Sequence, residues 1–576
     1  MANDPTSERI AVLLEQLLSI AQQGSAEMLH HALSQLNAAA PTGMPVAELR
    51  QKLLSVGIQI ADQQAGNIPV MTLAAELYWR QGDEGAALQR LEQVLKRADY
   101  PNAHLLAGSI HVRRRDLAHV QPHVERLTMI AGHLAETQDY AGAFLLQRQL
   151  YQRIGREYED EDFVYGVMHP VHLIMDRAGR QFAERFGRFD GKPARNGRHR
   201  IAFLFPVGAL LAHSEVVLMM CSGLAKLADH LIEPIIYVFD QIDPAFQNAF
   251  AACGVDVRQV PKMDINGPVI FGKMINLRSI LASEEIDTAV WVSVPVDANF
   301  YFGYRVAPRQ AYWSMKFHTL ITPGVDHLVS CGSWAQSEKT VHDRRWVIGS
   351  VAFADPLRDA DLAAAAKIRA DFAQFQPLLG VLAREEKIHS LPYLEAVARI
   401  LEQHPKAGFI WTGRTEHPAI RDFFAARGLG ERARWVGWVH TATYVHALDI
   451  FLETFPFGCG MTSAQALAAG KPLISYRDWT TVMGHHFAPV LEKRAGDAAT
   501  QRELTGLFTG RRGDSLFLMA DSADDYVEMA GRVIDDPILR EDLSALGREL
   551  VQRYLANSEM AARRFADIFR DIDRGD

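Results

Sequence analysis

Cysteine is scarce in this sequence of 576 residues, which contains four. They stand far apart, at Cys221, Cys253, Cys331 and Cys459, without any Cys-x-x-Cys pair. A disulfide framework or a zinc or iron–sulfur site needs cysteines at short, regular intervals, so the spacing argues against both. We therefore expect a protein of a reducing compartment.

An excess of positive charge is missing as well. Lys and Arg number 60 against 69 Asp and Glu, which gives a formal net charge of −9. Binding to a nucleic-acid backbone needs a basic face that neutralises phosphates. We predict no nucleic-acid partner.

Long hydrophobic runs are also absent. No apolar stretch reaches the roughly 18 residues that a membrane span requires, and the N-terminus shows no basic segment followed by an apolar block. We predict no membrane span and no secretion signal, and expect a cytoplasmic protein. Hydrophobic residues nevertheless make up 48% of a chain longer than one ordinary domain, which indicates several packed domains.

The first third of the chain is predicted to be helical. Apolar residues recur at three- and four-residue steps in the segments 10–21, 25–36, 46–63 and 72–96. Residues 75–87 have the hydrophobic, Gly, then Ala order of a tetratricopeptide helical hairpin, and residues 135–143 repeat it loosely. We predict an all-α, degenerate repeat domain over residues 1–190.

The periodicity changes after a polar, glycine-containing stretch at 187–199. Short apolar runs then alternate with helical patterns, which is typical of parallel, doubly wound sheets. The expected strands are 200–205, 234–239, 288–292, 310–313 and 346–348, and then 377–383, 407–411, 435–438, 449–452 and 472–476. We predict an α/β fold with two Rossmann-like lobes at 196–355 and 356–545, and a C-terminal helix at 546–576 that packs back across them. Ligands of such sheets bind at the carboxyl ends of the strands.

The most informative segment, residues 450–475, predicts a strand, a glycine turn, a helix and a second strand. Gly458 and Gly460 allow close approach to the backbone, and the amides of Met461, Thr462 and Ser463 would be exposed at the helix start, where a diphosphate binds well. The hydroxyls of Thr462 and Ser463 are further donors. A plain helix start capped by Gly470 is the alternative that local physics leaves open.

This segment resembles the diphosphate loop of the O-GlcNAc transferases and of the bacterial adhesin-type protein N-glycosyltransferases. Phe455-Pro-Phe-Gly458 is similar to the latter, and Gly460-Met-Thr-Ser463 to the former. The resemblance implies a glycosyltransferase-B fold and a nucleotide sugar, most simply a UDP-sugar, as co-substrate, with no cofactor and no metal. The family usually carries an aspartate for the nucleotide ribose where this chain has Gln465, whose carbonyl oxygen can still accept a hydrogen bond.

Other matches extend the resemblance. Lys387 follows the strand 377–383, where the family has a lysine that contacts the diphosphate. The segment 306–318 resembles a family strand and turn, and it places His318 near the transferring sugar and Lys316 near a phosphate, with an ordinary surface turn as the alternative.

Two further groups are candidates. His213, after the first strand of the first lobe, resembles a cleft-facing histidine and is our candidate for the acceptor-side base, with Glu215 as an alternative. Trp438, His440 and Tyr444 resemble the region that holds the nucleobase, although core packing is an equal alternative for Trp438.

A pair of adjacent histidines, His485 and His486, invites a metal-site interpretation. Neighbouring residues on a helix point about 100° apart, so the pair cannot supply two ligands to one ion. We predict no metal site there.

The resemblance favours a protein glycosyltransferase that acts on Asn or Ser/Thr in the bacterial cytoplasm. By analogy alone, the acceptor is a flagellin or an adhesin, presented by the helical domain. We expect inverting, metal-independent transfer with Lys387 stabilising the leaving group. Two alternatives stay open: transfer to a lipid or polysaccharide precursor, and a helical-repeat scaffold with a decayed transferase.

Overall fold

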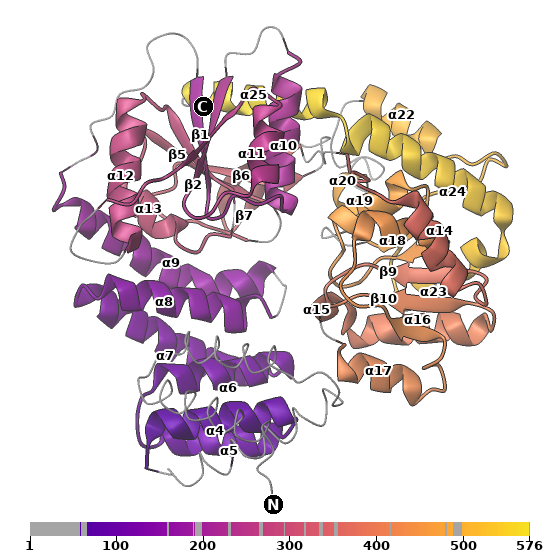
Figure 1. The fold of residues 1–576 in the computed structure, drawn as a ribbon, viewed down its shortest axis with the longest axis horizontal. Helices are drawn as coiled ribbons and strands as arrows, with labels where there is room; N and C mark the ends of the chain where they lie inside the picture. The colour runs from indigo at the N-terminus through magenta and orange to yellow at the C-terminus, as the bar shows by residue number, and fades with distance from the viewer. Residues whose placement is uncertain are drawn as a thin grey trace, which may run out of the picture. The chain divides into compact units, whose positions relative to one another are not determined.

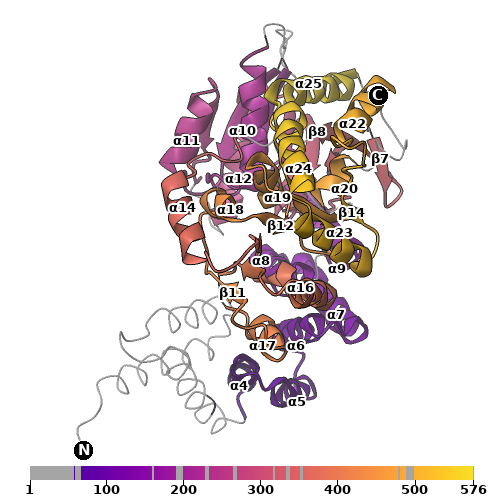
Figure 2. The same cartoon turned by 90° about the vertical axis from the view of Figure 1, so that its right-hand side faces the viewer.

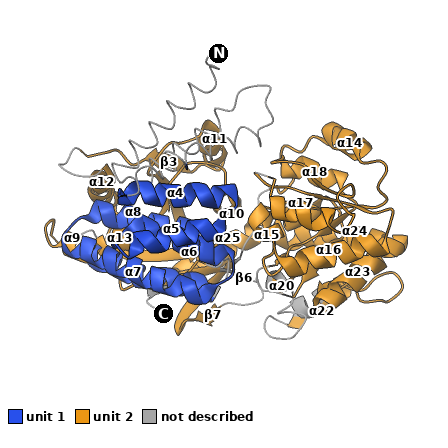
Figure 3. Cartoon of the chain, turned by 90° about the horizontal axis from the view of Figure 1, so that it is seen from below, with its two compact units in different colours: residues 1–178 blue, residues 179–576 orange. Residues whose placement is uncertain are grey.

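The structure of the protein, a computed structural model, divides the chain into two compact units, residues 1–178 and 179–576 (Figure 3). It describes residues 58, 66–157, 161–187, 189, 199–227, 232–263, 269–292, 294–315, 318–332, 338–350, 355–414, 416–477, 481–487 and 498–574. The helices expected at 10–21 and 25–36, and nearly all of that at 46–63, lie outside these residues. The four-part division of the chain stays a prediction.

The described part of the first unit is built from helices, which confirms the expected all-α start. They are α4 (Ile68–Gln81), α5 (Glu84–Leu95), α6 (Pro101–Arg113), α7 (Leu117–Glu136), α8 (Tyr140–Leu150), a π-helical turn (Tyr151–Gly155) and the beginning of α9 (Glu161–Ala183).

The segment 72–96 forms the helical hairpin predicted from residues 75–87, because the chain turns at Gly82. This glycine has φ of 95°, its amide donates to the Trp79 carbonyl oxygen at 3.0 Å, and it ends α4. The Asp83 side chain then caps α5 by accepting from Ala86 N at 2.9 Å. Ala75 and Ala87 are both buried in one core cluster, as expected for a helical hairpin with small residues at its contact.

The second unit contains two sheets, and the first has the strand order β3-β2-β1-β4-β5-β6-β8-β7 (Figure 1). Its strands are β1 (His199–Phe205), β2 (Ile232–Val238), β3 (Asp256–Gln259), β4 (Thr288–Trp291), β5 (Arg309–Ser314), β6 (His327–Gly332), β7 (Glu338–Val341) and β8 (Arg344–Ser350). All neighbours pair in parallel except β7 and β8. The order reverses between β1 and β4, which makes that point the expected ligand crevice of this sheet.

The second sheet repeats the same plan with the order β11-β10-β9-β12-β13-β14, all parallel. Its strands are β9 (Leu378–Val381), β10 (Gly408–Trp411), β11 (Ala433–Trp435), β12 (Ile450–Leu452), β13 (Leu473–Tyr476) and β14 (Met519–Ala520). The order reverses between β9 and β12. These two sheets confirm the predicted α/β class with a helical N-terminal part.

Helices connect and cover the strands of both sheets. They are α10 (Ala212–Leu224), α11 (Pro244–Ala251), α12 (Val269–Ser283), α13 (Ala298–Tyr304), α14 (Leu362–Asp371), α15 (Glu385–Ile388), α16 (Leu391–Gln403), α17 (Pro418–Ala425), α18 (Thr441–Ala447), α19 (Met461–Ala468), α20 (Val482–His486), α22 (Ala498–Leu507), α23 (Ala523–Asp535), α24 (Pro537–Leu550), the π-helical turn Val551–Leu555 and α25 (Ser558–Arg574). In the described part of the chain no helix is both long and apolar enough to cross a membrane.

The C-terminal helices α24 and α25 pack against elements of both sheets. Helix α25 lies beside α10 of the first sheet (Figure 1, Figure 2), where the Phe565 ring packs on Trp313 with centroids 4.5 Å apart. A Cβ atom at Gly223 of α10 would collide with the Ser558 carbonyl oxygen, so glycine permits this close approach. Helix α24 packs instead on α19 of the second sheet.

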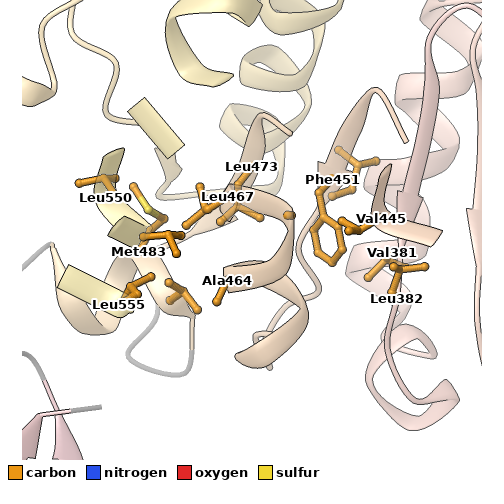
Figure 4. Close-up of a cluster of buried hydrophobic side chains, with 14 of the residues drawn as sticks. Val381, Leu382, Val445, Phe451, Ala464, Leu467, Leu473, Met483, Leu550 and Leu555 are labelled. Atoms are coloured by element: carbon orange, nitrogen blue, oxygen red, sulfur yellow. The ribbon is translucent and has the colours of Figure 1, made fainter. Parts of the chain in front are cut away.

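The core beneath the second sheet fixes the position of α19. Ala464 and Leu467 point from α19 into a buried apolar cluster with Leu473 of β13 and Phe451 of β12 (Figure 4). The helix start that was singled out in the sequence is therefore anchored on its inner face by apolar burial.

Candidate functional site

The candidate site lies at the point where the strand order of the second sheet reverses. The loop after β9 carries Lys387, and the glycine turn after β12 carries Gly458. The Lys387 Nζ atom donates to the Gly458 carbonyl oxygen at 2.6 Å, and the lysine is 8% exposed. Two segments predicted separately from the sequence are thus brought together.

The short helix α15 holds Lys387 in place. Ile388, next to it, is fully buried and anchors the helix from below. The Thr412 hydroxyl at the end of β10 donates to the Ala383 carbonyl oxygen and accepts from the Ala383 amide, both at 2.8 Å. Two residues after Thr412, the Arg414 amide donates to Glu385 Oε2 at 3.0 Å. These bonds fix the lysine loop against its neighbouring strand.

The start of α19 has the geometry expected of an anion site. Gly460, its N-cap residue, has φ of 63° and ψ of −106°, a backbone conformation that favours glycine. A Cβ atom there would meet nothing within 4 Å, so the requirement is conformational rather than steric. The first-turn amides, from Met461 onward, have no acceptor within the helix. They carry the positive end of the helix dipole.

A residue that the sequence analysis missed, Glu453, lies beneath this turn. Its carboxylate is fully buried and accepts from Cys459 N at 3.0 Å, Ser463 Oγ at 2.8 Å and Ser475 Oγ at 2.7 Å. Burial raises the pKa of Glu453, although these hydrogen bonds oppose the shift. The Ser463 hydroxyl is therefore committed to Glu453, and only its backbone amide remains for a ligand.

Aromatic residues tie Glu453 to the rest of the sheet. The Tyr526 hydroxyl donates to the Glu453 carbonyl oxygen at 2.9 Å, and the Tyr393 hydroxyl donates to the Leu452 carbonyl oxygen at 2.8 Å. The Phe455 ring stacks on Tyr476 at a centroid distance of 4.6 Å. The end of β12 and the glycine turn thus form a rigid support for α19.

Three buried polar atoms of the lysine loop and α19 have no hydrogen-bond partner. They are Glu386 Oε2, Thr462 Oγ1 and Gln465 Oε1. Buried polar atoms without partners are uncommon in proteins and each needs an explanation, of which a bound ligand is one. Gln465 stands where the resembling families have a ribose-binding aspartate, and its orphaned atom is an acceptor.

The predicted nucleobase residues lie in the loop before α18 and, for Tyr444, within that helix. Trp438 is 60% exposed, so the alternative of core packing is wrong for this side chain, and the Arg414 guanidinium lies 5.2 Å from its ring centroid. His440 is the N-cap of α18, and its Nδ1 lies 2.9 Å from Thr443 Oγ1. Tyr444 is half-buried against the core.

His213 lies in the first turn of α10, just after β1 in the first sheet. Its ring stacks on Phe205, with centroids 5.8 Å apart, and burial lowers its pKa to about 4. The imidazole is consequently neutral near pH 7 and able to accept a proton, but it is a weak base. Glu215, the alternative base, forms an ion pair with Arg358.

The segment 306–318 proves to be partly structural. Gln310 is fully buried, donates to the carbonyl oxygens of Phe302 and Gly324, and accepts from the Val306 amide, so it organises the chain around β5. His318 follows β5 and is half-buried. Lys316 lies outside the described residues, as do the side chains of His485 and His486 on α20.

A cavity of about 920 Å³ opens at the other end of the second sheet. Its lining includes Pro377, Asp449 and Pro472, which directly precede β9, β12 and β13. Ligands of open parallel sheets bind beyond the carboxyl ends of the strands, so this cavity is not the expected donor site.

Comparison with known families locates a transferase domain in the second sheet. Residues 378–491 match the family model described as glycosyl transferases group 1. The match begins at β9 and contains Lys387, Trp438, Gly458 and Gln465. No curated protein matches the sequence.

Solved structures show the same fold. A mutant of the O-GlcNAc transferase of Thermobaculum terrenum is similar over 98% of this chain and 98% of its own, with a TM-score of 0.55 and 18% identity. HepE of Anabaena with UDP and glucose is 12% identical, covers 65% of this chain and 100% of its own, and has a TM-score of 0.45. A glycosyltransferase from Rickettsia africae has the same identity and TM-score, and covers 66% and 100%. The first of these similarities shows that the chain has a glycosyltransferase-B fold.

Proposed function

We propose that this chain, a glycosyltransferase with the B-type fold, takes its sugar from a nucleoside diphosphate sugar. The diphosphate of this donor binds between Lys387 and the start of α19. The contact of 2.6 Å between Lys387 Nζ and the Gly458 carbonyl oxygen supports this, because it places a cation beside the helix-start amides. The unpartnered Thr462 Oγ1 and Gln465 Oε1 add a hydroxyl donor and an acceptor to the same site. A UDP-sugar is the proposed donor, with Trp438 stacking on its base.

In the proposed reaction the acceptor attacks the anomeric carbon from the face opposite the diphosphate, and the configuration inverts. The bond between the anomeric carbon and the diphosphate oxygen breaks, and its electron pair remains on the leaving nucleoside diphosphate. Lys387 and the amides of α19 stabilise this charge without needing a metal ion. The remaining protons of the Lys387 ammonium are suited to this task, since Gly458 uses only one of three.

The proton of the attacking group goes to a base of the first sheet, for which we propose His213. Its ring is neutral at physiological pH, as a base must be before it accepts a proton. Glu215 is a weaker candidate, because its carboxylate is already engaged in an ion pair with Arg358. We keep His318 as a proposed contact of the transferring sugar.

The proposed acceptor is a protein, modified on Asn or Ser/Thr in the bacterial cytoplasm. The similarity to an O-GlcNAc transferase over both the helical and the α/β parts of the chain supports a protein substrate. A lipid or polysaccharide precursor is the alternative acceptor. It would be favoured if the purified enzyme transferred sugar to lipid-linked substrates and to no peptide.

The test is a screen of nucleotide sugars for slow release of nucleoside diphosphate by the purified chain, with direct binding of the free diphosphates in parallel. We expect at least one nucleotide to bind and its sugar to be hydrolysed or transferred. A chain that neither binds nor cleaves any of them would be a helical-repeat scaffold with a decayed transferase, and the proposal would be wrong.

A further inference from the structure

Histidines and aspartates gather where α6 meets α7 in the helical unit. The two helices lie side by side (Figure 1, Figure 3). Gly108 of α6 lies close to α7: a Cβ atom added at this glycine would lie 3.7 Å from the Cβ atom of His123. The clustered residues are Asp99, His104, His111, Asp116, His119 and His123.

Asp116, in the turn between the two helices, is the centre of the cluster. Its Oδ2 lies 3.2 Å from Nδ1 of His111, and its Oδ1 lies 2.7 Å from Nδ1 of His119. One ligand atom from each of these three residues falls within 4.8 Å of the other two. A tetrahedral zinc ion with bonds of about 2.1 Å separates its ligand atoms by about 3.4 Å, so small side-chain rotations suffice.

The three residues suit a divalent cation, because imidazole and carboxylate both bind transition metals.

A second set of hydrogen bonds, which runs from Asp99 through His104, orients His123. His104 Nε2 lies 2.9 Å from Asp99 Oδ1, which assigns the ring proton to Nε2. With this tautomer, a neutral His104 ring offers Nδ1 as an acceptor to His123 Nδ1, which lies 2.9 Å away. This arrangement leaves the lone pair of His123 on Nε2. Carboxylate–histidine chains of this kind usually fix the tautomer of groups at a metal centre.

The position of His123 completes the pattern. It stands four residues after His119, so both side chains project from the same face of α7. The rings of His111 and His123 are nearly parallel, with centroids 6.0 Å apart.

We propose that this cluster is a binding site for a divalent transition-metal ion of the zinc type, with His111, Asp116 and His119 as ligands and His123 beside the fourth position. The ion would hold α6 and α7 together and stabilise the helical unit. Imidazole ligands suit zinc and cobalt and do not suit magnesium or calcium. The competing explanation is a hydrogen-bonded cluster without a metal, in which Asp116 only accepts hydrogen bonds from the two imidazoles.

The test uses the full chain without an affinity tag, stripped with a chelator and titrated with Zn²⁺ against a chromophoric chelator. His119→Gln removes one ligand from an exposed side chain, so the fold should survive. Asp116→Asn removes a second ligand. His133→Gln, an exposed histidine on the same helix and outside the cluster, is the matched control.

We expect one tight zinc ion per chain in the parent protein and in His133→Gln, and binding more than about tenfold weaker in the two ligand variants. Zinc should raise the unfolding midpoint of the parent by at least about 2 °C and leave that of His119→Gln unchanged. Cobalt should give a visible absorption spectrum in the parent and in His133→Gln but not in the two ligand variants, and magnesium should not compete. Absence of tight binding in the parent, or equal binding in the ligand variants, would overturn the proposal in favour of a hydrogen-bonded cluster without a metal.

Discussion

The ammonium of Lys387 and the carbonyl oxygen of Gly458 are 2.6 Å apart, although the two residues come from different loops of the second sheet. The loops follow β9 and β12, the strands between which the order of the sheet reverses. The topology, rather than the sequence separation, is what makes these residues neighbours. A cation held at this crevice, beside the start of a helix, is the feature on which the proposed donor site depends.

The first prediction separates binding from stability at Thr462. Its buried hydroxyl has no hydrogen-bond partner, so Thr462→Val should change the free energy of unfolding by less than about 0.5 kcal/mol. The affinity for a nucleoside diphosphate should fall about tenfold or more, because a hydrogen bond to a charged phosphate is lost. Calorimetric titration and denaturant unfolding measure the two quantities.

Thr412→Val is the matched control for this change. The Thr412 hydroxyl bonds both the amide and the carbonyl oxygen of Ala383, so its loss should destabilise the protein by about 1 to 2 kcal/mol. If Thr462→Val instead destabilises the fold and binds nucleotide normally, the hydroxyl has a structural role that we have not recognised.

The second prediction concerns Gln465, whose buried Oε1 atom we assign to the nucleotide ribose. Gln465→Ala should weaken the binding of a nucleoside diphosphate by about tenfold, since a hydrogen bond to a ribose hydroxyl disappears. The binding of inorganic pyrophosphate should stay unchanged. An equal loss for both ligands would place Gln465 on the diphosphate.

The third prediction tests Glu453 as a positioning residue. Glu453→Ala should destabilise the protein by more than about 3 kcal/mol, because three buried donors lose their acceptor. Glu453→Gln keeps the shape and one carbonyl oxygen, and should restore most of the stability but leave diphosphate affinity reduced. Glu395→Gln, at an exposed position on α16, should have neither effect. Full affinity in Glu453→Gln would show that the carboxylate does not shape the turn.

The fourth prediction is a pH dependence of stability from His213. Its pKa in the folded protein is about 4, below the ordinary value of 6.5, so the folded state binds fewer protons than the unfolded state between these values. The contribution of His213 to stability is therefore complete above pH 6.5 and is lost as the pH falls towards 4. Between pH 7.5 and pH 4.5 the parent should lose more unfolding free energy than His213→Asn.

The exposed histidine His133 again provides the control. His133→Asn should show the same loss as the parent over this pH range. If the parent and His213→Asn lose stability equally, His213 titrates near its ordinary value and is a stronger base than its surroundings imply.

Much of the fold was predictable, because strands that are buried on both faces appear in the sequence as short apolar runs. The strands β1, β2, β4 and β5 fall within one or two residues of the predicted segments. The strands β3, β6, β7 and β14 were not predicted. β3 reads Asp-Val-Arg-Gln at an edge of the sheet and β14 has two residues, so neither carries a hydrophobic pattern that periodicity can detect.

The candidate site was predictable where backbone conformation required a particular residue, and unpredictable where tertiary contacts decided the role. Gly460 needs its positive φ, and the sequence marked it. Glu453 directly follows the apolar strand β12, and an acidic residue at the end of such a strand could have been recognised in the sequence as a candidate site residue. The structural role of Gln310 and the commitment of the Ser463 hydroxyl depend on partners that no local pattern specifies.

The most direct test of the donor site is calorimetric titration of UDP, GDP and TDP into the parent chain, Lys387→Ala and the surface control Lys367→Ala. We predict that one of these nucleotides binds the parent and the control equally. Lys387→Ala should stay folded, bind the nucleotide at least about tenfold more weakly and lose about 10² to 10³ in turnover. Unaltered affinity and turnover in a folded Lys387→Ala variant would contradict the assignment of the donor site to the crevice between β9 and β12.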